Sequence, residues 1–290
     1  MNLTFRENYW QEPDLKKEFI SFLIRIHRLD LSLWDRLGYW DDNYRPFSYF
    51  DGDRLASSLC VYSMDMTVMG GRARVAQISA VGTDQKYQRR GLNRRLTEKA
   101  IEWASGTHDF FFLFADEGAF AFYEKCGFRR TLEHKAAITV AGAPPRSGAE
   151  KLDIENPGHR ELIHRLAAAR APVSDMLGVH NEKLLMFWCL YFLRDNIYHI
   201  ADLDTVVLCV REDRRLTIFD IVGAEMPAFE DIYPHIGSGS DELAEFMFMT
   251  DKLNLQTPPS FTPVEGNGTH LMGVFPLESS NFIFPSTSHA

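Results

Sequence analysis

The feature that most constrains this 290-residue chain is a basic segment around one glycine, Gln85–Leu96. Its five cationic side chains are Lys86, Arg89, Arg90, Arg94 and Arg95. Residues 75–81 before it read as a largely buried strand, and apolar residues after it recur at helical spacing up to Trp103. Gly91 therefore lies where a strand gives way to a helix, and the amides of a helix's first turn have no intrahelical acceptor. Because the helix dipole is also positive there, we expect this junction to hold a polyphosphate.

Composition indicates a globular protein, since 45% of the residues are apolar and no short repeat is evident. The longest apolar stretch, residues 184–193, is about half the length that a membrane span needs. Charged residues occur early in the chain without an uninterrupted apolar run, so no secretory signal is predicted. We expect a cytoplasmic protein that does not associate with a membrane.

Cysteine spacing and charge narrow the classes of partner. Four cysteines stand far apart with no C-x-x-C pair, which argues against a zinc site and against a disulfide framework. We therefore expect no metal. Residues 1–140 hold 20 Lys and Arg against 19 Asp and Glu, whereas residues 141–290 hold 11 against 21. The acidic second half disfavours nucleic acid and either attracts a cationic small molecule or peptide, or serves only solubility.

The chain is expected to form two domains. Residues 141–150 are rich in proline, glycine and small residues and are predicted to link a first domain, 1–140, to a second, 151–290. The elements expected in the first are helices over Leu15–Ile26 and Phe120–Cys126, and strands over Leu55–Met66, Arg74–Val81, Phe110–Phe114 and Ala136–Val140. This order predicts a mixed α/β fold in which the basic loop follows a central strand.

Two motifs carry a resemblance to a known family. Gln88–Asn93 resembles the Q/R-x-x-G-x-G/A signature with which the GNAT superfamily of N-acetyltransferases binds acetyl-CoA. Ala121–Phe128 resembles the second motif of that superfamily, a tyrosine on a short helix followed by Gly-Phe. The two occur in the family's order, and the resemblance covers about residues 1–140. It implies a GNAT acyl-CoA acyltransferase fold, an α/β fold with a mixed sheet, and acetyl-CoA as co-substrate.

The resemblance also implies roles for the residues that would bind CoA. Backbone groups of Val81, Gly82 and Thr83 would bond to pantetheine and to the thioester carbonyl. The residues that would wrap the pyrophosphate are Gln88, Arg89, Arg90, Gly91, Leu92 and Asn93, with Arg94 at its edge. Asn93 departs from the pattern, which has Gly or Ala there. It either crowds the diphosphate or donates its amide to a phosphate oxygen.

Tyr123 is the residue expected to carry protonation chemistry. The resemblance implies direct transfer, in which an amine attacks the thioester and Tyr123 protonates the departing thiolate of CoA. Such a proton transfer contributes about 10²- to 10⁴-fold in rate. The alternative is a tyrosine that only packs between Phe122 and Phe128.

The general base is less evident in the sequence. The central strand has Gln77 and Ser79 where relatives often have a carboxylate or histidine. Asp116 and Glu117 follow the next strand and are candidates, as is a chain of waters. In tandem relatives that modify aminoglycosides the chain's own terminal carboxylate serves. Here that carboxylate is on Ala290, behind an apolar run over residues 282–285 that would anchor the tail, although a solvated end is the alternative.

The acceptor is expected to meet the loop after the first helix, residues 33–50. This loop combines aromatic residues with aspartates, so it either binds a cation by ring faces and carboxylates or docks the second domain. The candidate acceptor-binding residues are Trp34, Tyr39, Trp40 and Tyr44 from this loop, with Gln77 and Ser79 from the strand.

The second domain has no motif that stands alone. Its expected elements are helices over His159–Arg170, Lys183–Leu193 and Phe229–Ile236, a ribbon of Thr205–Arg211 and Arg215–Val222, and a strand over Glu245–Met249. Their order resembles that of the first domain without the phosphate signature. We therefore expect a degenerate, non-catalytic GNAT-like half that lends acidic walls to a cleft.

Together these features predict an N-acetyltransferase that moves an acetyl group from acetyl-CoA to a primary amine of a small molecule or peptide. Two alternatives are kept. One is a CoA-binding sensor or scaffold without turnover, motivated by Asn93 and by the absence of a base on the strand. The other is an acyltransferase that uses a longer acyl-CoA. No nucleic-acid partner is expected, and a homodimer is left open.

Overall fold

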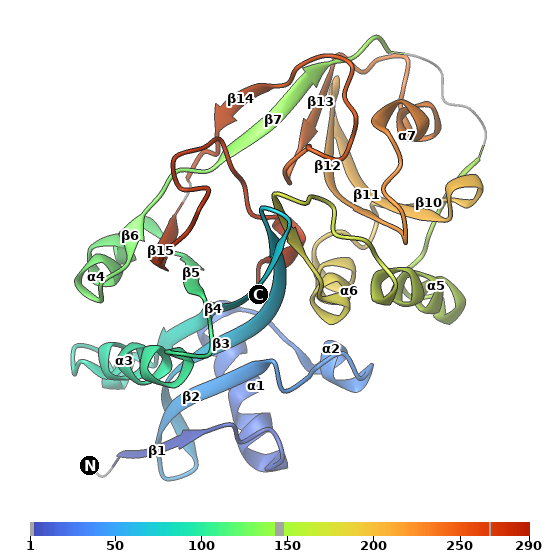
Figure 1. The fold of residues 1–290 in the computed structure, drawn as a ribbon. Helices are drawn as coiled ribbons and strands as arrows, with labels where there is room; N and C mark the ends of the chain where they lie inside the picture. The colour runs from blue at the N-terminus through green and yellow to red at the C-terminus, as the bar shows by residue number, and fades with distance from the viewer. Residues whose placement is uncertain (1–2, 143–147, 267) are drawn as a thin grey trace.

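The computed structural model describes residues 3–142, 148–266 and 268–290, and these form two mixed β-sheets with helices packed around them (Figure 1). The first sheet has the order β1-β2-β3-β4-β5-β15-β6, with β9 paired to β3. The second has the order β14-β7-β13-β12-β11-β10-β8. The mixed α/β class predicted from the sequence is confirmed.

The first sheet holds the central strands of the predicted acyltransferase fold. Its strands are β1 (Leu3–Glu7), β2 (Tyr44–Asp51), β3 (Arg54–Val68), β4 (Gly71–Thr83), β5 (Phe110–Phe114), β6 (Arg129–Arg130), β9 (Leu177–Val179) and β15 (Thr269–Gly273). Its helices are α1 (Pro13–His27), α2 (Ser32–Arg36), α3 (Leu92–Ala104) and α4 (Phe120–Lys125), with 3₁₀ turns η1 (Gln85–Tyr87) and η2 (Glu117–Ala119). Strands β1 to β4 are antiparallel neighbours, whereas β4 and β5 are parallel.

The second sheet is built mainly from the later part of the chain. Its strands are β7 (His134–Thr139), β8 (Ala149–Lys151), β10 (Ile197–Ile200), β11 (Thr205–Glu212), β12 (Arg215–Val222), β13 (Leu243–Phe246) and β14 (Ser260–Pro263). The helices are α5 (Pro157–Ala168), α6 (Glu182–Tyr191) and α7 (Phe229–Ile236), with 3₁₀ turns η3 (Ala201–Leu203) and η4 (Ser286–Ser288). The predicted strand over Glu245–Met249 thus begins earlier and ends at Phe246.

The two halves exchange strands, so the predicted boundary at residue 140 does not separate the sheets. Strand β7, expected to complete the first domain, pairs with β13 and β14 in the second sheet. Conversely, β15 pairs with both β5 and β6, and β9 pairs with β3. Which strand edge a distant strand pairs with is not determined by the residues next to it in the sequence. The exchange of strands could therefore not be predicted from the hydrophobic pattern. Half of the predicted linker, residues 143–147, lies outside the described residues, and β8 begins at Ala149, within the described remainder of the linker.

The segment 33–50, predicted as a loop, contains part of α2 and most of β2. Strand β2 lies between β1 and β3, and its side chains are buried on both faces: Tyr44 and Phe50 belong to one core cluster and Phe47 to another. A strand covered on both sides has no alternation of apolar and polar residues to reveal it.

Helix α6 connects the cores of the two sheets. Its buried side chains, such as Leu184 and Leu190, belong to one cluster with Phe19 of α1 and Val206 of β11. Because neighbours cover it on all sides, this helix is apolar around its whole circumference. None of the helices in the described residues is long and apolar enough to cross a membrane.

Candidate active site

Strands β4 and β5 separate in the middle of the first sheet, and this separation creates the site. Their parallel pairing runs from Val75 with Phe110 to Ile78 with Leu113. On the other side of β4, the pairing with β3 is irregular near Cys60, and Ala80 has a left-handed backbone with φ +50°. A bulge of this kind bends a strand and re-aims its end. The end of β4, from Ser79 onward, is thereby free to bind a ligand by its backbone.

A cavity of 640 Å³ occupies this opening and reaches both faces of the sheet. On the α3 and α4 side it is lined by Asn93 and Tyr123, and β4 contributes Gln77, Ser79 and Val81. This volume lies in the range of small-molecule sites in proteins.

A second hollow of 460 Å³ lies over the basic loop and shares Val81, Asn93 and Phe122 with the cavity. It is lined by the predicted CoA-binding residues Val81, Gly82, Thr83, Gln88, Arg89, Arg90, Gly91, Leu92, Asn93 and Arg94, among others. The structure therefore brings together every residue predicted for CoA binding, with Tyr123 in the adjoining cavity.

Two glycines shape this hollow for different reasons. Gly91 is the N-cap of α3, has φ +70° and makes no side-chain cap bond, so amides of the first turn can face an anion. A Cβ there would meet nothing within 4 Å, so glycine is required by the backbone angle rather than by space. At Gly82, a Cβ would lie 2.8 Å from Ile26 and 3.3 Å from His27 Nε2. Glycine at that position lets the end of α1 approach β4.

Asn93, the departure from the family pattern, has its side chain fixed within the protein. Its Oδ1 accepts hydrogen bonds from the hydroxyls of Ser57 at 2.7 Å and Thr83 at 2.8 Å. The side chain is thus turned toward β3 and β4. Its oxygen is occupied, which leaves the amide nitrogen as the end that can donate to a phosphate.

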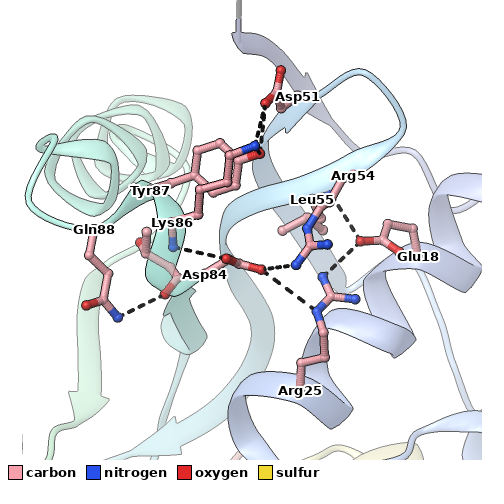
Figure 2. Close-up of polar contacts among 10 residues, drawn as sticks. Glu18, Arg25, Asp51, Arg54, Leu55, Asp84, Lys86, Tyr87 and Gln88 are labelled. Atoms are coloured by element: carbon pink, nitrogen blue, oxygen red, sulfur yellow. Dashed lines mark hydrogen bonds and ion pairs between the residues drawn. The ribbon is translucent and has the colours of Figure 1, made fainter. Parts of the chain in front are cut away.

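A polar network supports the start of the basic loop (Figure 2). The Asp84 carboxylate accepts from the Lys86 amide at 3.2 Å and from Arg54 at 2.7 Å, and Arg25 lies 4.0 Å away. The bond from Arg54 holds the pKa of Asp84 below its usual range. Gln88 donates to the Thr83 carbonyl at 3.3 Å, which ties the loop back to β4.

Two arginines of the loop, Arg90 and Arg94, bond to neighbouring groups of the loop and of α3. Arg90 donates to the Lys86 carbonyl at 3.3 Å, and Arg94 pairs with Glu98 at 2.9 Å. Both side chains of the Arg94–Glu98 pair are more than half exposed, and exposed pairs contribute little to stability. The Arg94 guanidinium can therefore turn to a bound polyphosphate at small cost.

Tyr123 lies on α4, where its ring packs against aromatic neighbours and also lines the cavity. Its ring packs against Phe122 at 5.0 Å and Phe128 at 6.0 Å between centroids, and it lines the cavity. Burial raises the pKa of its phenol well above the usual value, with smaller contributions from Cys126 and Asp116. The hydroxyl therefore stays protonated at neutral pH and has a proton to give.

The base candidates separate in the structure. Asp116 lines the rim of the cavity, whereas Glu117 is not among the described residues that line it. Ala290 lines the cavity and donates its backbone N–H to Gln77 Oε1 at 3.0 Å. His27 also lines it, and no sequence signal identified this residue, because it reaches the site only through the close approach of α1 to Gly82. Partial burial lowers the pKa of the His27 imidazole, against the opposing field of Asp116, so the ring is neutral near pH 7.

The C-terminal segment is packed into the first sheet by aromatic contacts. Phe284 stacks on Phe112 with centroids 4.3 Å apart, and the ring of His289 stacks on Phe114 at 3.6 Å. Trp188 donates to the His289 carbonyl at 2.8 Å. The apolar run near residue 282 thus anchors the tail, as its composition suggested.

A buried ion pair of the second sheet fixes the same tail. Asp220 and Arg170 pair at 0% and 2% side-chain exposure, with Arg170 donating to Asp220 at 3.0 Å. The Thr287 hydroxyl also donates to Asp220. Because Thr287 lies in η4, this bond orients the last residues toward the cavity.

The predicted acceptor residues divide into two groups. Trp34, Tyr44, Gln77 and Ser79 line the cavity. Tyr39 and Trp40 are not among its described lining residues; Tyr39 packs against His164 at 5.2 Å, and Trp40 against Trp10 at 4.8 Å. The prediction that these two bind the acceptor is not supported, since both rings fill core space beside the site.

Trp34 both lines the cavity and docks the second half. Its Nε1 donates to the Lys183 carbonyl at 3.0 Å, and its ring lies 5.9 Å from that of Phe187. The second half contributes Leu184, Phe187, Phe192 and Ala290 to the cavity, none with an acidic side chain. The expected acidic walls are therefore replaced by apolar ones, and no Asp or Glu of the second half is among the described residues that line the cavity.

The arrangement of a splayed parallel strand pair, an anion-binding helix start and a cavity between them defines an acyl-CoA acyltransferase fold. Comparison with known proteins agrees. Residues 33–131 match the family described as acetyltransferase (GNAT) domain, and no curated protein matches the chain. Residues 33–131 thus match a GNAT domain, as the two motifs indicated, and acyl transfer is the activity that this match supports.

Solved structures show that the fold extends over nearly the whole chain. Eis1 from Mycobacterium abscessus is 16% identical, with 96% of this chain and 75% of that one covered and a TM-score of 0.59. A probable N-acyltransferase from Enterococcus faecalis V583 is 14% identical, with 93% and 72% covered and a TM-score of 0.61. A GCN5-related N-acetyltransferase from Anabaena variabilis is 16% identical, with 92% and 72% covered and a TM-score of 0.57. At these identities the likeness concerns the fold alone.

Proposed function

We propose that the protein transfers an acetyl group from acetyl-CoA to the primary amine of a small molecule or peptide by direct attack on the thioester. One observation carries the proposal: the hollow over the basic loop and the cavity that contains Tyr123 meet at Val81 and Asn93. A CoA held by its pyrophosphate in the hollow can therefore place its thioester in the opening beside β4.

Binding in this scheme uses backbone groups first. The α3 amides behind Gly91 and the loop arginines hold the pyrophosphate, while Val81, Gly82 and Thr83 bond to pantetheine and the thioester carbonyl. Backbone donors aimed at the carbonyl oxygen stabilise the negative charge that develops when the amine attacks. Holding both reactants in one cavity supplies much of the remaining rate increase.

Two proton transfers complete the reaction. The amine nitrogen bonds to the acetyl carbon, the C–S bond breaks, and Tyr123 donates its proton to the departing thiolate. The proton lost by the amine passes to a base facing the cavity: Asp116, the neutral imidazole of His27 or, where the polypeptide ends at Ala290, its α-carboxylate. Glu117 would act only through water.

Three changes assign the base. Asp116→Asn, His27→Gln and a one-residue extension after Ala290 each remove or displace one candidate. The base is the group whose change lowers kcat and removes the acidic limb of the pH–rate profile, since that limb reports its protonation.

Thiol release from acetyl-CoA, measured over a panel of amines, tests the proposed function, with Tyr123→Phe assayed beside the wild type. We expect release that depends on the amine and falls about 10²- to 10⁴-fold in Tyr123→Phe at unchanged CoA affinity. CoA binding without release from acetyl-CoA or any longer acyl-CoA would instead support a sensor, the alternative favoured by Gln77 and Ser79 standing where a base is expected.

The remaining parts of the proposal concern cellular location, partners and oligomeric state. Cytoplasmic location fits a co-substrate that is a cytoplasmic metabolite, and no nucleic acid is expected as a partner of an acidic chain with net charge −9. A homodimer is tested by light scattering of the purified protein.

A further inference from the structure

The acceptor side of the cavity is a box of buried aromatic rings. Tyr44 and Tyr62 form its floor, as cross-strand neighbours on β2 and β3 with ring centroids 5.9 Å apart. Trp34 of α2 and Phe187 of α6 form its wall, with ring centroids 5.9 Å apart. All four rings line the cavity and are at most 8% exposed.

The polar atoms of this box are largely bonded within the protein. Tyr62 Oη accepts from Asn181 Nδ2 at 2.7 Å, and Trp34 Nε1 donates to the Lys183 carbonyl at 3.0 Å. These bonds fix the rings in place. What the box presents to a ligand is therefore chiefly ring surface, which favours an apolar or aromatic group.

Charge is sparse in the cavity and confined to exposed side chains. Among the described lining residues, Asp116 carries the one acidic side chain, against the cationic Arg28 and the titratable His27. All three lie at the exposed rim, on α1, its C-cap and the segment after β5. A polycation needs several carboxylates to replace the water that it loses on binding, and this cavity does not offer them.

We propose that the acceptor is a monoamine whose nitrogen is borne on an aromatic or bulky apolar body, rather than a polyamine or an aminoglycoside. The body fills the box of Trp34, Tyr44, Tyr62 and Phe187, and the amine points back to the thioester between β4 and Tyr123. This inference rests on the proposed acyl transfer and specifies its substrate class.

The test is kcat/KM for acetyl transfer to 2-phenylethylamine, propylamine, spermidine and kanamycin, followed by thiol release. The account predicts a value for 2-phenylethylamine at least about 10²-fold above the other three, because one ring fills several apolar subsites at once. Phe187→Leu should raise KM for 2-phenylethylamine about tenfold and leave KM for acetyl-CoA unchanged. Phe261→Leu, in an exposed side chain of β14 away from both hollows, is the matched control and should change neither value.

Other outcomes overturn the inference in distinguishable ways. Faster turnover of spermidine or kanamycin would contradict the substrate class and leave acyl transfer standing. Rates that grow with acyl-chain length and ignore the body of the amine would assign the box to an acyl chain. Thiol release with none of the amines, from a protein that binds CoA in calorimetry, would defeat the proposed transfer and this inference together. If Phe187→Leu unfolds at a lower temperature than the wild type, the wild type is instead titrated calorimetrically with 2-phenylethylamine and with propylamine in the presence of CoA. Equal affinities for the two amines would contradict the binding of an aromatic body in the box.

Discussion

The two sides of the cavity are built in opposite ways. The CoA side comes from one continuous stretch, from the end of β4 through the start of α3, and depends on backbone amides and on positive backbone φ angles such as that of Gly91. The acceptor side combines β2, β3 and α2 with α6, which lies up to about 150 positions away in the sequence, as in the contact of Trp34 with Lys183. A continuous site can be recognised in a sequence, whereas an assembled one becomes visible only once the chain is folded.

The two sides also differ in how they are held. Around the basic loop, ion pairs such as Arg94–Glu98 and Arg54–Asp84 include side chains that are more than half exposed. The segment that reaches the cavity from the second half is fixed by the fully buried Arg170–Asp220 pair. We therefore expect changes on the CoA side to affect mainly affinity, and changes behind the acceptor side to affect mainly stability.

Asp220→Asn should have the largest effect. It leaves the buried Arg170 charge without its partner, which typically costs about 3–5 kcal/mol, and it weakens the bond from Thr287. Urea denaturation gives the free energy of unfolding. Thr287→Val, which removes one hydroxyl and keeps the pair, is the control and should cost about 1 kcal/mol. A loss in Asp220→Asn no greater than in Thr287→Val would contradict the view that this pair anchors the second half.

Gly91→Ala should come next and act on the CoA side. An alanine at φ +70° costs about 1–2 kcal/mol of backbone strain. If the helix start relaxes to relieve the strain, CoA affinity should fall about tenfold. Gly106 is the matched control: it too has a positive φ, +80°, and open space around a Cβ, but it lies past the other end of α3. Gly106→Ala should show a similar loss of stability in thermal melts and unchanged CoA affinity in calorimetry; an equal loss of affinity would show that Gly91 has no special part in binding.

Because His289 is buried, we expect the stability of the folded protein to depend on pH. Burial lowers the pKa of its imidazole to about 3, from an unfolded value of 6.5. The unfolded chain therefore binds a proton below about pH 6.5 that the folded chain rejects, so stability falls as the pH drops from about 6.5 toward 3. At pH 5.5 the loss is about 1.4 kcal/mol relative to pH 7.5. His289→Phe should remove this part of the difference in urea denaturation, and an unchanged difference would contradict it.

Asp84→Asn should have the smallest effect. Its partner Arg54 is more than half exposed, and such pairs contribute at most about 1 kcal/mol. Because the pKa of Asp84 is lowered by Arg54, this contribution is present near neutral pH and disappears as the pH falls below the usual carboxylate range. CoA affinity should fall less than threefold, by about 0.6 kcal/mol or less, in calorimetry. A larger loss would mean that the network of Figure 2 holds the loop in its binding shape.

The features that could be predicted from the sequence divide in the same way, between those set by neighbouring residues and those assembled by the fold. The helix start at Gly91 and the strand Phe110–Phe114 were predictable because each is decided by neighbouring residues. The placement of β7 and β15 was not, because strand pairing between halves depends on edges that only the fold creates. In the site, Tyr123 followed from a local motif. Tyr62, Phe187 and His27 could not be identified from the sequence. The strand register of β3, the packing of α6 and the close approach of α1 to Gly82, respectively, bring them to the cavity.

We propose that one cavity joins a binding side for CoA to an aromatic binding side for the acceptor. A bisubstrate compound, CoA linked through its sulfur and an acetyl bridge to the nitrogen of 2-phenylethylamine, tests it directly by calorimetry. We expect the bisubstrate compound to bind at least about 10²-fold tighter than CoA, with that gain reduced in Phe187→Leu and CoA affinity itself unchanged there. A bisubstrate that binds no tighter than CoA, or a gain that Phe187→Leu leaves intact, would contradict the account.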